Sequence, residues 1–184
     1  LGATLAAYVR DFKTEDIRLA LQTFVPSPAM TPGRMNMFNF KNFTVMLDYA
    51  HNTHGIQAIG KYVQSVDAPL KVGIVAGVGD RRDEDIISLG EESAKIFDEI
   101  IIRQDKNLRG RTEEEMIELM TRGIKNIDPL KKITLFRKES EAIDHAIATA
   151  QKDSFIVVIS DVVPDALDQV KRYKDIEDGV EVTA

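Results

Sequence analysis

Four short aliphatic runs between positions 72 and 160 constrain the fold of this chain more than any other feature. They are VGIVAG (72–77), EIIIR (99–103), ITLF (133–136) and FIVVIS (155–160). Strands that are apolar on both sides are typical of a parallel sheet covered by helices on both faces. Segments of helical composition alternate with them, near 53–66, 83–97, 112–124, 139–151 and 164–173. The sequence therefore predicts an α/β fold: a Rossmann-like, open, mostly parallel sheet with right-handed crossovers.

The first part of the chain is organised differently. NMFNF and TVMLDY flank Lys41 and Asn42, which predicts a β-hairpin whose second strand continues into the sheet. Residues 1–9 and 14–24 have helical composition, with Thr14 as the expected cap of the second helix. VPSPAMTPG holds three of the six prolines, so residues 25–33 are predicted to form a linker. We therefore expect a helical segment (1–24), a linker and one main domain (34–184).

Composition argues against several classes of function. The net charge of -6, the pI near 5.2 and the scattered basic residues disfavour nucleic-acid binding. There are no cysteines for disulfides or thiolate metal sites, and no apolar run approaches the roughly 20 residues of a membrane span. These features predict a cytoplasmic protein without a membrane partner. The start LGATLAAYVR resembles no signal peptide and carries no initiator Met, which suggests a piece of a longer protein.

Polar residues gather where the predicted strands end. Ligands of open α/β sheets bind outside the carboxyl ends of the strands. Asp48, the segments 77–80 and 103–105, and the pair at 160–161 all fall at such ends. The sequence therefore predicts a ligand site along this edge of the sheet.

The segment VMLDYAHNTHG (45–55) allows three interpretations of its polar side chains. Asp48, His51 and His54 could bind zinc or iron, although a strand end and a helix start need not make their side chains converge. Asp48 and Asn52 could simply cap the next helix, leaving the histidines in solvent. In a nucleotide site, Asp48 would accept hydrogen bonds from ribose hydroxyls and neutral His51 would stack on a base.

Two nearby segments bear on the nucleotide interpretation. In TPGRMN, the turn at Pro32 and Gly33 would present Arg34, whose guanidinium makes paired hydrogen bonds to phosphate; an ordinary salt bridge is the alternative. GVGDRRDED (77–85) is not a phosphate loop, because the chain has no GxxxxGK[ST] and carboxylates at the next helix start would repel phosphate. A cationic ligand group suits that rim, which holds Asp80 and Arg81.

The segment IIIRQDKNLRGRTEEE (100–115) predicts a second recognition element. It places Asp105, Arg109 and Arg111 in a polar loop before a helix that Thr112 is expected to cap. Opposite charges a few residues apart suit an amino acid, one for its carboxylate and one for a cationic side chain. The alternative is a solvated loop without a ligand.

With these residues identified, the chain resembles the carboxyl-terminal domain of the Mur ligase family, and within that family the cyanophycin synthetase branch. DYAHN and RQDxxLRGR are the specific segments, and residues 1–24 resemble the last helices of the family's central ATPase domain. The other supporting segments follow in the family's order, covering about residues 24 to 125: PGRMNMF, GIQAIGKYV and VAGVGDRRDEDI.

The resemblance implies an ATP-dependent amide ligase, in which ATP phosphorylates a carboxylate and an amine attacks the acyl phosphate. Arg34 would meet the phosphates of ATP, Asp48 the ribose and His51 the adenine, with Asn52 in the same ATP-binding segment. Mg²⁺ would be held mainly by the central domain. The parent is expected to contain central and amino-terminal domains and to form a homo-oligomer.

The resemblance also implies that the charged loops select the incoming amino acid, through Asp80, Arg81, Asp105, Arg109 and Arg111. In the cyanophycin synthetase branch this amino acid is arginine, which is joined to the side-chain carboxyls of an aspartate-rich polymer. The chain lacks the GKGHE segment of peptidoglycan ligases, which favours that branch.

Two departures from the family pattern keep alternatives open. Thr53 stands where proline usually follows the asparagine, and GVGD replaces the more common GPGD. A peptidoglycan-type ligase, a paralogue with another amino acid and a non-catalytic nucleotide-binding module therefore remain possible interpretations. With no phosphate loop, the chain alone is expected to fold but to lack ligase activity.

Overall fold

A six-stranded sheet with one antiparallel edge organises the chain. The computed structural model describes residues 2–24, 27–104 and 108–180. The strand order is β1-β2-β6-β3-β4-β5, and every neighbouring pair is parallel except β1 with β2. The strands are β1 (Asn36–Asn39), β2 (Phe43–Asp48), β3 (Lys71–Val75), β4 (Glu99–Arg103), β5 (Lys132–Phe136) and β6 (Ser154–Ile159). The predicted mostly parallel sheet and its leading hairpin are confirmed.

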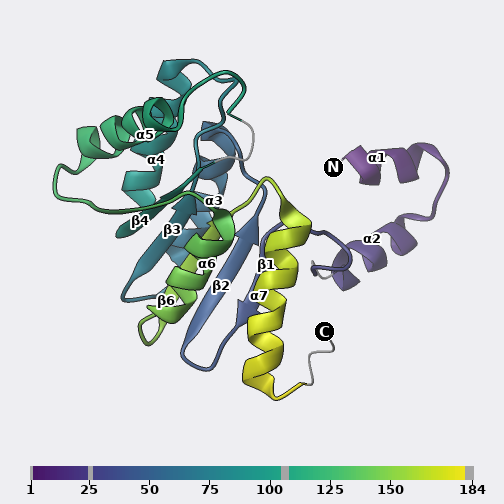
Figure 1. Cartoon of the computed structure of the whole chain (residues 1–184). Helices are drawn as coiled ribbons and strands as arrows, with labels where there is room; N and C mark the ends of the chain where they lie inside the picture. The colour runs from purple at the N-terminus through teal and green to yellow at the C-terminus, as the bar shows by residue number, and fades with distance from the viewer. Residues whose placement is uncertain (1, 25–26, 105–107, 181–184) are drawn as a thin grey trace.

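Helices cover both faces of this sheet, as predicted. Figure 1 shows α6 and α7 crossing the near face, with the other three domain helices behind the strands. The layers follow from strands that are apolar on both sides. Those helices are α3 (Thr53–Ser65), α4 (Asp83–Ile96), α5 (Glu113–Ile127), α6 (Glu139–Ala148) and α7 (Val163–Asp178).

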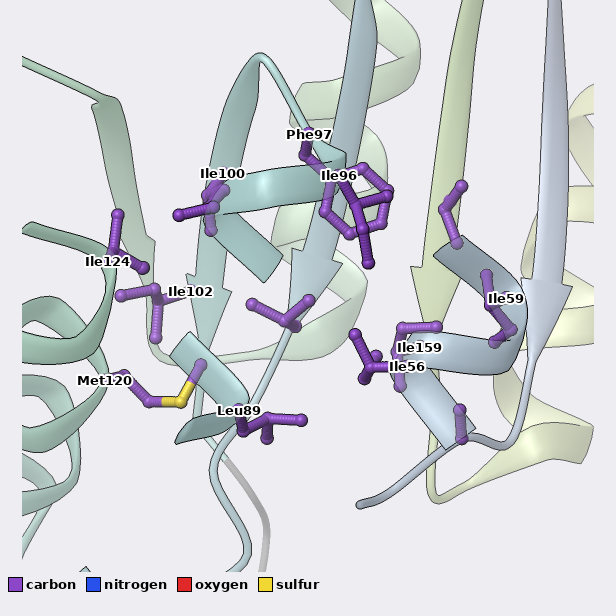
Figure 2. Packing of buried hydrophobic residues seen from close by; sticks show 14 of the residues in the cluster. Ile56, Ile59, Leu89, Ile96, Phe97, Ile100, Ile102, Met120, Ile124 and Ile159 are labelled. Carbon is purple, nitrogen blue, oxygen red and sulfur yellow. The ribbon is translucent and has the colours of Figure 1, made fainter. Parts of the chain in front are cut away.

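The central strand β6 shows why both faces must be covered. All six of its residues are buried. Val157 and Ile159 point into the core under α3, α4 and α5, whereas Ile156 and Val158 belong to the core under α6 and α7. Figure 2 shows the first core, in which Ile159 lies near Ile56 of α3. Successive side chains of a pleated strand point to opposite faces of the sheet, so β6 contributes to two separate cores.

The helices α1 (Gly2–Val9) and α2 (Thr14–Thr23) contribute nothing to these cores, because none of their residues is buried. Figure 1 shows them to the side of the sheet. The predicted Thr14 cap is wrong: Lys13 is the cap residue of α2, and no side chain caps the helix, so Thr14 opens its first turn. No helix in the described part of the chain is both long and apolar enough to cross a membrane.

Candidate ligand site at the carboxyl ends of the strands

Asp48 ends β2 and fixes the turn that carries Arg34. Its side chain is buried at 7 % exposure, and its two carboxylate oxygens accept hydrogen bonds from the backbone amides of Met35 (2.9 Å) and Ala50 (2.8 Å). Gly33 enters this turn with a φ of 68°, a conformation that glycine adopts without steric cost. Asp48 therefore anchors the turn, and it does not cap α3.

Arg34, Tyr49 and His51 form a continuous row of flat groups beside this anchor. The Arg34 guanidinium lies 5.2 Å from the centre of the Tyr49 ring, a cation–π contact, and the centre of the His51 ring lies 5.0 Å from that of Tyr49. Within the described residues Arg34 forms no ion pair, so its exposed charge is available to an anion. The salt-bridge alternative for Arg34 finds no support.

The tautomer of His51 follows from its backbone contact. Its Nδ1 lies 3.3 Å from the carbonyl oxygen of Tyr49, which can only accept a hydrogen bond. A hydrogen bond to this oxygen requires the Nδ1–H tautomer, in which Nε2 is an acceptor. The ring keeps a half-buried position with a flat surface to offer a ligand.

A cleft of about 290 Å³ opens next to His51. Asn52 lines it and caps α3, since its side-chain oxygen accepts a hydrogen bond from the Gly55 amide (2.8 Å). The opposite wall comes from α4, where hydrogen bonds from Arg82 lower the pKa of the Asp85 carboxyl and keep it ionised. Arg82 balances the Asp85 charge, and Arg81 lines the same wall.

The metal interpretation of the Asp48 segment receives no support from the described residues. Both Asp48 oxygens already accept backbone amides, and His54 is exposed on α3. No group of three or more histidine, cysteine, aspartate or glutamate side chains in the described ranges is arranged to hold a metal ion.

A second group of charges forms where two loops touch. Arg109 of one loop pairs with Asp80 of the other, and both side chains are nearly half exposed. The Arg111 side chain is only 18 % exposed. It donates hydrogen bonds to the backbone carbonyls of Gly79 and Arg81 in the loop after β3, and it pairs with Asp83 at the start of α4. Thr112 caps α5 as predicted, accepting a hydrogen bond from the Glu115 amide (3.1 Å).

The structure thus separates the predicted site residues into two groups. Asp48, Arg34, His51 and Asn52 meet at the end of β2, whereas Asp80, Arg109 and Arg111 meet after β3 and β4. Arg81 links them, because it lines the His51 cleft while its Nε lies 3.9 Å from the Asp80 carboxylate. Asp105 lies outside the described residues.

Sequence reasoning placed residues 103 and 160–161 at strand ends, but it missed that they form a buried ionic cluster with Glu139 on the other side of the same edge. Arg103 ends β4 with its side chain 5 % exposed and pairs with Glu139 (3.0 Å) and Asp161 (2.6 Å). It also donates to the carbonyl of Ile159 (3.1 Å), and the Ser160 hydroxyl donates to Glu139 (2.8 Å). These groups border a cavity of about 180 Å³. The continuous run of Ile before Arg103 was the one available sign that its side chain would be buried.

Sequence comparison extends the similarity to nearly the whole chain. The cyanophycin synthetase of Nostoc sp. is 39% identical over 171 residues, which are 93% of this chain and 19% of that protein. The UDP-N-acetylmuramoyl-L-alanyl-D-glutamate–2,6-diaminopimelate ligase of Bacteroides thetaiotaomicron is 31% identical over 156 residues, 83% of this chain and 31% of that protein. The chain therefore spans about a fifth to a third of the length of these relatives.

Solved structures share the fold. A UDP-N-acetylmuramoyl-L-alanyl-D-glutamate–2,6-diaminopimelate ligase aligns with a TM-score of 0.66 at 18% identity, covering 96% of this chain and 37% of that one. A folylpolyglutamate synthase of Mycobacterium tuberculosis, complexed with ADP and AMPPCP, aligns with a TM-score of 0.61 at 19% identity, covering 89% of this chain and 35% of that one. At these identities the alignments establish the architecture alone.

The family assignment comes from a sequence model described as "Mur ligase, glutamate ligase domain". This model matches residues 33–162, which include the sheet from β1 to β6 and both groups of site residues. The match covers well over half of the chain and agrees with the resemblance expected from the DYAHN and LRGR segments. The chain belongs to the Mur ligase family, of which it carries the glutamate ligase domain.

Proposed function

We propose that this chain is the carboxyl-terminal domain of an ATP-dependent amide ligase resembling cyanophycin synthetase, and that it forms one side of the ATP site and selects the incoming amino acid. The observation that carries the proposal is the row of Arg34, Tyr49 and His51 beside the cleft at the end of β2. The row contains the Arg34 cation, which suits the phosphates of a nucleotide, and the flat His51 ring, which suits its base.

The charges around the cleft orient the nucleotide. On the α4 wall Arg82 already pairs with Asp85, whereas Arg34, which does not line the cleft, forms no ion pair within the described residues. The base is therefore proposed to lie against His51 and Asn52, with the phosphates directed to Arg34. Asp48 accepts a ribose hydroxyl in this proposal, using a second lone pair on an oxygen that already accepts an amide.

The incoming amino acid is proposed to bind at the Asp80–Arg109 pair. Both partners are nearly half exposed, and an ion pair in such a position is worth little, so a ligand can replace it. An amino acid with a cationic side chain would replace the Asp80–Arg109 ion pair. Its carboxylate would pair with Arg109, and its side-chain cation would pair with Asp80. Arg81 and Asp105 are included in this proposed site, and arginine is the proposed amino acid.

The proposed reaction needs more than this chain. A side-chain carboxylate of polyaspartate attacks the γ-phosphorus of ATP and releases ADP; the amine then attacks the acyl carbonyl, loses a proton and expels phosphate. The chain has no GxxxxGK[ST] segment, and its described residues form no metal site. We therefore assign phosphoryl transfer and Mg²⁺ to a central domain in a longer cytoplasmic parent, with residues 1–24 as the end of that domain and 25–33 as the linker.

Kinetics of the full-length ligase test the ATP assignment. His51→Ala should raise the KM for ATP about five- to hundredfold, since one base stacked on an aromatic side chain is worth roughly 1–3 kcal/mol. His145→Ala is the matched control, because this histidine packs against Phe136 on the opposite layer and should leave the KM unchanged. An unchanged KM for ATP in both variants would refute the nucleotide site.

A further inference from the structure

Arg111 differs from the other charged residues of the two loops in how completely the protein engages it. Its Nε donates to the carbonyl of Gly79 (3.2 Å), and its Nη2 donates to the carbonyl of Arg81 (2.8 Å). Nη2 also pairs with Asp83 (2.8 Å), and Nη1 pairs with Glu115. All three guanidinium nitrogens therefore bind the protein itself.

These contacts join backbone segments that already touch. A Cβ added to Gly79 would lie 2.1 Å from the carbonyl oxygen of Leu108, so the loop after β3 and the loop before α5 are in direct contact there. Arg111 spans this contact and donates to the carbonyls of Gly79 and Arg81, the residues on either side of Asp80. On its own side of the contact it pairs with Glu115 of α5, the helix that Thr112 caps. Arg111 thus fixes Asp80 and Arg81 relative to Arg109.

Arg109 differs from Arg111 in exposure and in backbone conformation. Its side chain is 46% exposed, and its backbone has a φ of 51°, a left-handed conformation that is unfavourable for a non-glycine residue. Such a conformation persists only where the surroundings hold it. The loop contact at Gly79 and the neighbouring Arg111 supply that support.

We propose that Arg111 is a positioning residue for amino-acid selection, rather than one of the groups that touch the amino acid. This inference rests on the proposed amino-acid site at Asp80 and Arg109. In this inference Arg109 and Asp80 pair with the two charges of the amino acid. Arg111 does not contact the amino acid and sets the distance between Arg109 and Asp80. Sequence alone groups Arg109 with Arg111, and only their contacts distinguish them.

Analogues of arginine separate the two roles in the full-length ligase. Agmatine lacks the carboxylate of arginine, and citrulline lacks its side-chain charge, so both are measured as competitive inhibitors. Arg109→Met should abolish the preference for arginine over agmatine, because it removes the carboxylate partner. Arg111→Met should weaken arginine about tenfold to hundredfold, because arginine needs both charged groups at a set distance. Agmatine and citrulline each engage only one of these groups and should change much less, and the KM for ATP should stay unchanged.

A double-mutant cycle adds a readout that a substrate contact would not move. Asp83→Asn with Glu115→Gln alters only the partners of Arg111, so it should reproduce part of the loss in amino-acid affinity. In the Arg111→Met background the same pair of changes should have no further effect, because the interactions are already gone. Additive losses in the cycle, or an equal loss of arginine, agmatine and citrulline in Arg111→Met, would overturn the proposal.

Amide hydrogen exchange on the 184-residue chain tests the inference without any substrate. Arg111→Met should speed exchange at Gly79, Asp80 and Arg81, whereas Arg109→Met should leave those amides as they are. Unchanged exchange in Arg111→Met overturns the positioning role. If the full-length ligase joins no amino acid, the proposed function fails, and this exchange measurement alone decides the role of Arg111.

Discussion

Removing the Arg103 side chain should destabilise the domain more than removing any exposed arginine. In Arg103→Met, the carboxylates of Glu139 and Asp161 keep their places at 13% and 30% side-chain exposure but lose the cation between them. The carbonyl of Ile159 also loses its guanidinium donor. Breaking a buried ion pair by removing one partner costs about 3–5 kcal/mol, and the partial exposure of Asp161 places the expected loss near the lower end.

Urea and thermal unfolding of the 184-residue chain measure this loss. About 3 kcal/mol corresponds to a decrease of roughly 6–12 °C in Tm for a domain of this size. Arg137→Met is the matched control, since Arg137 borders the same cavity but is 82% exposed in its pair with Glu113. That exposed pair should contribute less than about 0.5 kcal/mol.

A triple variant separates charge from shape. Arg103→Met combined with Glu139→Gln and Asp161→Asn removes the uncompensated carboxylates, so it should recover most of the stability that Arg103→Met loses. Two results would refute the reasoning: a loss in Arg103→Met no larger than in Arg137→Met, or a triple variant less stable than the single one. Either would mean that the cluster is solvated well enough to tolerate unpaired charge.

Two further substitutions test packing and capping by urea unfolding. Gly73→Ala should lower the free energy of unfolding by about 1–3 kcal/mol, because the new Cβ would lie 2.3 Å from Cδ2 of buried Phe97. Gly2→Ala is the control and should show no loss, because no atom lies within 4 Å of its new Cβ. Equal effects of the two changes would contradict the packing argument. Asn52→Ala should cost about 1 kcal/mol by removing the cap of α3, and Asn52→Asp should retain the stability; a loss in both would show that the cap bond to Gly55 is not the cause.

Local sequence signals accounted for most of the fold. Continuous Ile and Val runs marked β3, β4 and β6 to within two residues, because a strand buried on both faces has no room for polar alternation. The edge strand β5 has no buried residue, and ITLF still marked it to within one residue. Thr112 was predictable as a cap because its bond is to Glu115, three residues away. Thr14 is also followed by acidic residues, Glu15 and Asp16, yet α2 begins without a side-chain cap, because a capping sequence specifies a tendency and not a bond.

The site was predictable where its contacts are local and unpredictable where they are not. The placement of Asp48, His51 and Asn52 follows from one strand end and one helix start. The burial of Arg103 depends on Glu139 and Asp161, which belong to later elements and meet it only after β6 enters the sheet. The different environments of Arg109 and Arg111 likewise depend on a loop contact near Gly79 that no spacing rule encodes.

The central position of β6 has a consequence for how the chain is made. β6 pairs on one side with β2, where Ser154 faces Phe43, and on the other with β3. Until residues 154–159 leave the ribosome, β2 and β3 each keep an open apolar edge, and the nascent chain holds two half-sheets with nothing between them. We therefore expect the insertion of β6 between β2 and β3 to be the slowest step of folding, and the nascent chain to be most prone to aggregation just before it.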